Sequence, residues 1–393
     1  MLFLKSNHTE TNPKTYTEPS FSYINRCGRQ EFFRIRDVLE DWFSRYPKIE
    51  KDEFLSRFQS ENNTSFTSSF FELYLHELLL RLKYSVHIHP KISESKLKKP
   101  DFLAIAPDGK ELFIEAVITT EAKKESSSAN AIKKVVYDKI NTLNDPNFYV
   151  KLNEKSFPLT APSGKNIKNC IKKWLQSLDP DQCLKLVIQK NFDDLPKLNF
   201  KHDNWEIEFT AYPRSIKARG KPGRRLISAH TPCFQKIDSS TPLRKAILRK
   251  ATHYGDLGKP YFIAVNMLGN FIDDIDIMDA LFGKETIVFN HPFDLGKEHE
   301  ITREPNGAWT SVFGPRYSRV SGVLIGLNIL PWNIAKNDLA LYINPWSKYP
   351  YECPIMDLTK YTPINNKLEK KEGVHPRLIF ELSEDWPSEN SYN

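Results

Sequence analysis

The spacing of apolar and polar positions along the chain predicts an α/β protein. Helical spacing is found at about 31–45, 51–60 and 69–83, and the last of these segments is apolar on nearly every side. Further elements follow in order: strands at 84–89, 101–106 and 111–119, helices at 130–143 and 166–177, a strand at 205–212, a helix at 242–254, and strands at 260–265, 320–329 and 339–343. Alternation of strand, helix and strand implies a mixed sheet with parallel pairs buried under helices.

Three regions of the chain are expected. Residues 1–60 predict an N-terminal helical extension, and 351–393 a peripheral, polar C-terminal segment. Between them, 61–350 contains no linker long or polar enough to mark a boundary, so we expect one core with insertions and a large C-terminal elaboration.

Composition narrows the class of protein. A content of 40% apolar and 12% aromatic residues excludes a wholly disordered chain, and 56 Lys and Arg against 49 Asp and Glu give a net charge of +7. Five cysteines without metal-ligand spacing fit a reduced compartment. No signal-like segment begins the sequence, and the best apolar stretch, 320–330, is too short to cross a bilayer, so we expect a cytoplasmic protein with no membrane partner.

Two carboxylates are predicted to face each other across a hairpin. Asp101 and Glu115 flank a turn at 107–109, and if Ala106 pairs with Lys110, Asp101 pairs with Glu115 on the same side of the sheet. Facing carboxylates repel each other unless a divalent cation or a shared proton lies between them, and Mg²⁺ is the natural oxygen-bound cation. A register shifted by one residue would instead separate the two side chains.

Glu72 is a candidate third acid. It lies on the predicted helix without a polar face, and neither lysine nor arginine follows four positions later. Glu77, in contrast, is followed by Arg81 at that spacing and is expected to form a solvated ion pair with it. The alternative is structural, because Ser69 and Glu72 have the spacing of a capping box at a helix start.

These residues resemble the PD-(D/E)xK nuclease superfamily: Glu72 on a helix, Pro100 and Asp101 opening a strand, and Glu115 and Val117 in the next strand. The helix–strand–strand–strand order is similar as well. The resemblance covers about 68–145, and later segments at 254–266, 280–283 and 344–346 are similar to uncharacterised bacterial proteins with this core.

The resemblance implies a restriction-endonuclease-like α/β fold and a metal-dependent endonuclease that hydrolyses phosphodiester bonds of DNA, in bacterial restriction or anti-phage defence. It implies that Asp101 and Glu115 bind Mg²⁺, or Mn²⁺ in its place, with help from Glu72. A nuclease acting on RNA, and a nucleic-acid-binding protein on the same fold that lacks catalysis, are the alternatives. Cutting of both strands by one site per chain would imply a homodimer or a higher homo-oligomer.

The superfamily's lysine is expected two residues after the second acid, where this chain has Val117. Some members carry the lysine on the helix that follows. On the helix predicted at 130–143, Lys139 lies in the middle of the apolar face formed by Ile132, Val136, Ile140 and Leu143. Lys139 is therefore the catalytic candidate, which would stabilise charge on the phosphate or orient the attacking water. The alternative is that the aliphatic part of the Lys139 side chain covers apolar surface while its ammonium reaches solvent.

A basic run without acids is expected to bind the nucleic-acid backbone. It spans 213–225 and contains the residues Arg214, Lys217, Arg219, Lys221, Arg224 and Arg225. Such loops bind phosphates by counterion release, without reading sequence. Two other basic clusters could extend the surface: Lys165, Lys168, Lys172 and Lys173, and Arg244, Lys245, Arg249 and Lys250.

Overall fold

The computed structural model describes residues 1–4, 8–92, 99–121, 126–221, 225–231, 238–269, 272–288, 300–352, 354–364 and 367–388. The chain forms two compact α/β units. Unit 1 consists of 1–10, 20–122 and 237–393, and unit 2 of 11–19 and 123–236. The α/β class is confirmed. Within the region 61–350, expected as one core with insertions, residues 123–236 form a compact unit between two segments of unit 1.

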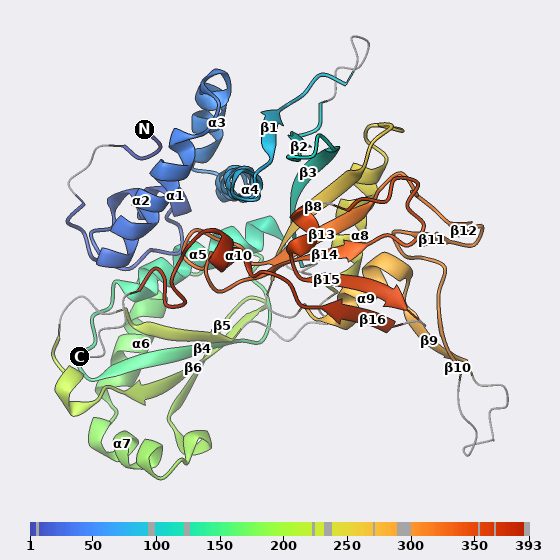
Figure 1. Cartoon of the computed structure of the whole chain (residues 1–393). Helices are drawn as coiled ribbons and strands as arrows, with labels where there is room; N and C mark the ends of the chain where they lie inside the picture. Colours follow the sequence, from blue (N-terminus) through green and yellow to red (C-terminus); the bar gives the residue numbers. More distant parts are fainter. Residues whose placement is uncertain are drawn as a thin grey trace. The chain divides into compact units, whose positions relative to one another are not determined.

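Unit 1 contains an eight-stranded mixed sheet in the order β1-β2-β3-β8-β13-β14-β15-β16 (Figure 1). The strands are β1 Ser85–Ile88, β2 Phe102–Ile105, β3 Glu111–Thr120, β8 Tyr261–Leu268, β13 Gly322–Leu327, β14 Leu339–Ile343, β15 Lys360–Ile364 and β16 Lys367–Lys371. The pairs β3–β8, β8–β13 and β14–β15 are parallel, and the others are antiparallel. Two short ribbons are added, β9 Glu285–Val288 with β10 Glu300–Arg303 and β11 Thr310–Ser311 with β12 Gly314–Pro315.

The helices of unit 1 pack on the two faces of this sheet. They are α1 Ser20–Arg26, α2 Gln30–Ser44, α3 Lys51–Phe58, α4 Asn63–Arg81, α8 Ser240–Ala251, α9 Asp274–Phe282 and α10 Pro376–Ile379. Leu112 and Ile114 of β3 join one core with α1 to α4, whereas Phe113 and Val117 join a second core with α8 and α9. Alternation along β3 thus assigns even-numbered residues to the α4 face and odd-numbered residues to the α8 face.

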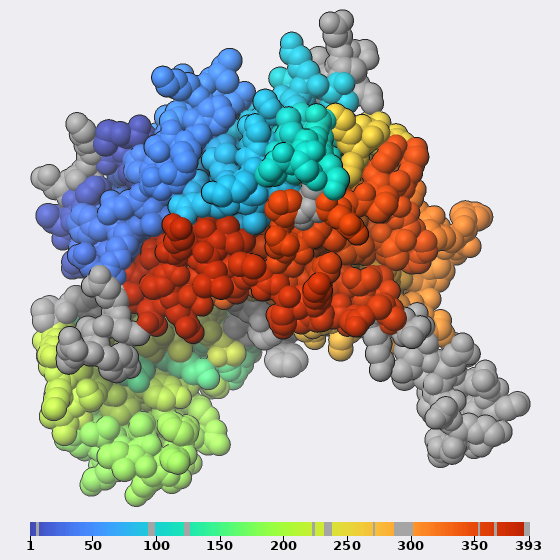
Figure 2. Space-filling view, in the orientation of Figure 1, coloured from blue at the N-terminus to red at the C-terminus, as the bar shows by residue number. Residues whose placement is uncertain are grey.

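The N-terminal helices and the C-terminal segment belong to the same core. α1 lies before the first helix predicted from the sequence, and its Phe21 and Ile24 are buried in the α4 core. Trp42 of α2 packs on Phe380 with ring centroids 4.7 Å apart. Figure 2 shows the red C-terminal segment bordering the blue N-terminal helices. The segment 351–393 is therefore less peripheral than predicted, since it supplies two strands of the sheet as well as this packing.

Unit 2 is built around a four-stranded sheet in the order β5-β6-β4-β7. Its elements are α5 Ser127–Asn141, β4 Phe148–Glu154, α6 Gly164–Gln176, α7 Pro180–Ile188, β5 Lys197–His202, β6 Trp205–Pro213 and β7 Ile227–Thr231. Val150, Leu152, Phe209 and Trp205 form its core with Ile167 and Ile171 of α6. Among the described residues of the chain, no helix is long and apolar enough to span a bilayer.

Candidate functional site

The hairpin of β2 and β3 brings Asp101 and Glu115 together. β2 pairs Phe102 with Ile114 and Leu103 with Phe113, so the next pair in the same register is Asp101 with Glu115. The predicted register is confirmed. The two residues are also linked directly, because the Asp101 N–H lies 3.3 Å from Glu115 Oε2 and donates to it. Both belong to the odd-numbered positions that face α8.

Each carboxylate is held by a neighbour. Asp101 Oδ2 accepts a 2.7 Å hydrogen bond from the Ala116 N–H, and no described residue donates to Oδ1. Glu115 is 3% exposed, and its Oε2 accepts a 2.6 Å hydrogen bond from the Tyr254 hydroxyl. The Lys250 ammonium, on the last turn of α8, forms an ion pair with Glu115 Oε1. The two carboxylates are thus fixed in place beside one ammonium.

Negative charge exceeds positive charge at this pair. The pKa of Asp101 is raised from 3.8 to about 7, first by burial and then by the charges of Glu115 and Glu72, and the charge of Lys250 offsets only part of this. Burial and the bond to Glu115 also raise the pKa of Tyr254, so its hydroxyl keeps its proton. The site therefore favours either a proton on Asp101 or an additional cation.

Glu72 has a different environment from the one predicted. It lies within α4, not at its start, because Asn62 caps the helix by accepting hydrogen bonds from the N–H groups of Thr64 and Ser65. The capping-box alternative is therefore wrong. Glu72 is 4% exposed, with Arg57 Nη1 2.7 Å from Oε2 and the Tyr46 hydroxyl donating to Oε1 at 2.5 Å.

Glu77, expected to be solvated, is fully buried. Its Oε1 accepts hydrogen bonds from Arg45 and Arg81, each at 2.8 Å. Both glutamates of α4 are thus neutralised by arginines, and in each case one arginine lies outside α4. Spacing within a single helix does not show such a partner.

The three predicted metal-binding acids do not form one ligand group. α4 packs on the even-numbered face of β3, whereas Asp101 and Glu115 face α8. No group of three His, Cys, Asp or Glu side chains in the described part of the chain is arranged to hold a metal ion. Glu72 acts on Asp101 through its charge, while its own oxygens are bound to Arg57 and Tyr46.

We expect Glu72→Gln to lower the free energy of unfolding by about 2–4 kcal/mol, because the half-buried Arg57 would lose its counter-charge. Urea unfolding followed by circular dichroism measures this. The matched control is Glu53→Gln, since Glu53 is 69% exposed and its carboxylate lies 3.9 Å from the same Arg57. We expect that change to cost less than about 0.5 kcal/mol. Equal effects of the two variants would contradict the assignment of Glu72 as the principal partner.

Lys139 is not inside the apolar face of its helix. It belongs to α5 of unit 2 and is exposed, so the structure does not group it with the carboxylates of unit 1. The buried lysine of α5 is Lys133, whose ammonium lies 2.6 Å from Glu154 Oε2. Val136 and Ile140 of the predicted apolar face are buried, and Ile132 and Leu143 pack against the same core. The buried face also includes Ala129, Lys133 and Tyr137, which places its centre further from Lys139 than predicted.

The basic run of unit 2 is divided between structural and exposed residues. Arg214 is buried and donates to the backbone carbonyl of Asp145, which is not the exposed phosphate contact that was predicted. Arg219 pairs with Asp181 at 2.9 Å. These two arginines stabilise the loop itself.

The other four basic residues of the run differ in their surroundings. Lys217 and Lys221 are exposed and fit a backbone-binding role. The guanidinium of Arg225 lies over the Tyr16 ring, 5.8 Å from its centroid. Arg224 lies outside the described residues. The loop thus offers fewer cations for phosphate than its sequence predicts.

Lys250 and Tyr254 were missed as members of the site. Lys250 was predicted only as part of a basic cluster. Tyr254 was predicted only as the end of the helix at 242–254 and as part of a segment similar to uncharacterised bacterial proteins. The helix predicted at 242–254 was expected to connect the strands at 205–212 and 260–265. That expectation is wrong, because β6 (Trp205–Pro213) belongs to the sheet of unit 2, and α8 packs on β3 and β8 instead. The catalytic lysine was predicted on α5 because α5 is the next helix after β3 in sequence. Since unit 2 is inserted at this point, α5 does not connect β3 to β8.

Comparison with known proteins does not name a family: no family model, curated protein or solved structure matches the chain.

Proposed function

We propose that this protein is a metal-dependent nuclease that hydrolyses phosphodiester bonds of DNA, with Asp101, Glu115 and Lys250 as its catalytic group. The observation that carries the proposal is the Lys250 ammonium paired with Glu115, beside the facing carboxylate of Asp101. Two carboxylates can hold a divalent cation, and a nearby ammonium can stabilise negative charge on a phosphate, which are two contributions that promote phosphodiester hydrolysis.

The order of elements in unit 1 supports a restriction-endonuclease-like core. α4 is followed by β1, β2 and β3, and then, after unit 2, by α8 and β8. β3 and β8 are parallel neighbours, and α8 packs against both, so α8 is the helix that follows β3 in the fold. Position 117, where the superfamily's lysine is expected, is a valine in this chain. Lys250 on α8 would take its place, since some members of the superfamily carry the lysine on the helix that follows.

The residues present fit a divalent cation. Asp101 and Glu115 supply carboxylate oxygens, and Asp101 Oδ1 lacks a donor among the described residues. The Ala116 carbonyl lies on the same strand edge as its N–H, which donates to Asp101, so it could add a third oxygen. Mg²⁺ is typically held by one or two carboxylates, with water and phosphate completing its shell. When bound, it would polarise the phosphate and lower the pKa of a water molecule.

The chain's own residues have separate roles in this proposal. Tyr254 and the Ala116 N–H fix the orientations of the two carboxylates. Lys250 neutralises Glu115 when the site is free, and its ammonium would stabilise negative charge developing on the phosphate oxygens during hydrolysis. Its side chain is 20% exposed, so it can be reached by substrate.

Removal of the metal tests the proposal. Purified protein incubated with supercoiled plasmid and Mg²⁺ should convert it to nicked or linear DNA, and EDTA should abolish the conversion. Mn²⁺ in place of Mg²⁺ should also support cleavage. A structured RNA incubated in parallel distinguishes a ribonuclease. Cleavage that persists in EDTA would overturn the metal site, and DNA binding without cleavage in either metal would identify a non-catalytic binding protein.

A further inference from the structure

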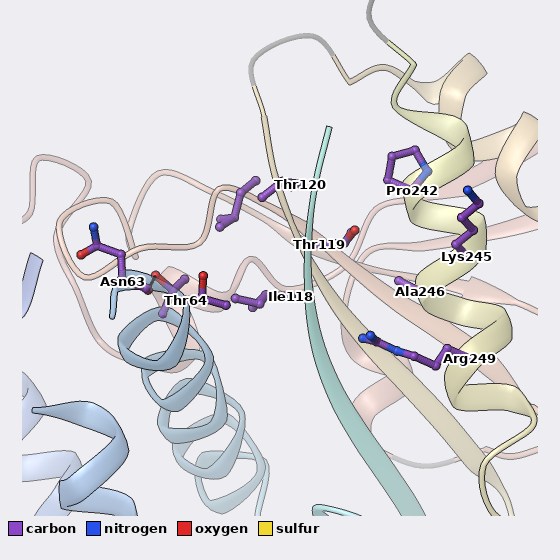
Figure 3. Close-up of a pocket in the computed structure, with 11 residues that line it drawn as sticks. Asn63, Thr64, Ile118, Thr119, Thr120, Pro242, Lys245, Ala246 and Arg249 are labelled. Atoms are coloured by element: carbon purple, nitrogen blue, oxygen red, sulfur yellow. Dashed lines mark hydrogen bonds between the residues drawn. The ribbon is translucent and has the colours of Figure 1, made fainter. Parts of the chain in front are cut away.

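A second feature of unit 1 lies beside the proposed catalytic group. It is a pocket of about 540 Å³ between the start of α4, the end of β3 and the face of α8 that carries Lys245 and Arg249 (Figure 3). α4 contributes Thr64 and Thr67, β3 contributes Thr119, and α8 contributes Lys245 and Arg249. In Figure 3 the Arg249 side chain points from α8 towards β3.

The pocket is continuous in structure with the catalytic group. Arg249 immediately precedes Lys250 on α8, and the pocket-lining part of β3 begins three residues after Glu115. β2 pairs with β3 as far as Ile114, whereas β8 pairs with it as far as Thr120. Beyond Ala116, no described strand covers the outer edge of β3. This open edge includes Ile118, Thr119 and Thr120, which line the pocket.

The chemistry of the pocket favours an anion. Lys245 and Arg249 are both exposed, and neither forms an ion pair with a described residue. The lining contains no carboxylate, and its threonine hydroxyls and the Asn63 amide add uncharged hydrogen-bonding groups. This differs from Lys250, whose charge is already balanced by Glu115. A ligand with a phosphate and a polar sugar or base would match this lining.

The size of the pocket limits the form of the ligand. Its volume lies within the range of small-molecule sites, so it can enclose a nucleotide-sized group, while a base-paired segment would have to remain outside. We propose that the pocket binds a phosphate-bearing nucleotide of a single strand next to the bond to be cut, and thus selects single-stranded or frayed DNA. This inference rests on the proposed nuclease function, because it assigns the substrate form of the same site.

Binding in EDTA separates the pocket from catalysis. Fluorescence anisotropy of the full chain with a labelled single-stranded oligonucleotide, and with a hairpin duplex of the same length, should show tighter binding of the single strand. Lys245→Ala and Arg249→Ala should each weaken single-strand binding about 10-fold and lower the slope of log K against log salt by about 0.7. The exposed Lys336 outside the pocket provides the matched control, and Lys336→Ala should change neither value.

The outcomes distinguish the two proposals. Equal binding of duplex and single strand, or pocket variants that bind like Lys336→Ala, would overturn the pocket assignment even if plasmid is cleaved. Pocket-dependent binding of the single strand without cleavage in Mg²⁺ or Mn²⁺ would support the pocket and overturn the nuclease. Because both substituted side chains are exposed, thermal unfolding should be unchanged, which shows that any loss of binding is local.

Discussion

Asp101→Asn should reduce the rate of DNA cleavage by at least about 100-fold. The same change should make the metal-free protein more stable at pH 8. The variant loses an oxygen anion for the cation, whereas its amide oxygen can still accept from the Ala116 N–H. Its stability should rise because the pKa of Asp101 is raised from 3.8 to about 7 by burial and by Glu115 and Glu72. An ionised Asp101 is therefore a cost of folding that asparagine does not carry.

The sign of the pH dependence follows from the same shift. The folded protein holds the Asp101 proton at pH values where the unfolded chain has lost it, so wild-type stability decreases between about pH 4 and 7 and stays lower above that range. At pH 8 the cost is at most about 4 kcal/mol. Thermal unfolding in EDTA should therefore show a higher midpoint for Asp101→Asn at pH 8 and a smaller difference at pH 5.

Added Mg²⁺ should reverse that order. It should raise the unfolding midpoint of the wild type, because the ion binds only the folded state, and should have little effect on Asp101→Asn. Cleavage by the variant at more than a tenth of the wild-type rate would contradict the role of Asp101. A lower midpoint of the variant in EDTA at pH 8 would contradict the excess of negative charge at the pair.

Lys250→Met should reduce cleavage at saturating Mg²⁺ by about 10²–10³-fold, because the charge that stabilises the reacting phosphate would be absent. The metal-free variant should also be about 3–5 kcal/mol less stable, since Glu115 would be left buried without a counter-charge. Mg²⁺ should restore more stability to this variant than to the wild type, because the ammonium no longer competes for Glu115. Single-turnover cleavage and thermal unfolding with and without Mg²⁺ measure both effects.

Lys139→Met is the matched control, since Lys139 is an exposed lysine of a helix and was the catalytic candidate from the sequence. We expect it to change neither cleavage nor stability. If Lys139→Met abolishes cleavage while Lys250→Met does not, the assignment of the lysine reverses. Lys250→Met combined with Glu115→Gln should regain metal-free stability but not cleavage, which separates folding from chemistry.

The acidic hairpin could be predicted from sequence because its information is local. The turn at 107–109 fixes the register, and period-two alternation then places Asp101 and Glu115 on one face. Other helices and strands were also predicted within a few residues, and β14 was predicted with its observed bounds, but elements such as α7, β4, β5, β15 and β16 were not predicted. α4 was recognised as buried, although it begins six residues before the predicted start at Ser69, at the cap made by Asn62.

The partners of the charged residues could not be predicted in the same way. Arg57 neutralises Glu72 from another helix, and Glu154 allows Lys133 to be buried on a helix face that was expected to carry Lys139. Lys250 meets Glu115 across 135 residues of sequence. Such pairs depend on tertiary contacts, which the periodicity of one segment does not contain.

The larger part of unit 2, residues 123–236, lies between β3 and α8 in sequence and so interrupts one strand–helix–strand unit of unit 1; the short segment 11–19 belongs to unit 2 as well. The pairing of β3 with β8 uses no residue of the insertion, and the contacts among Asp101, Glu115 and Lys250 lie within unit 1. Under the proposed function, the residues that cut and the residues of unit 2 would therefore belong to separate parts of the chain, and a change of unit 2 would alter the target rather than the chemistry.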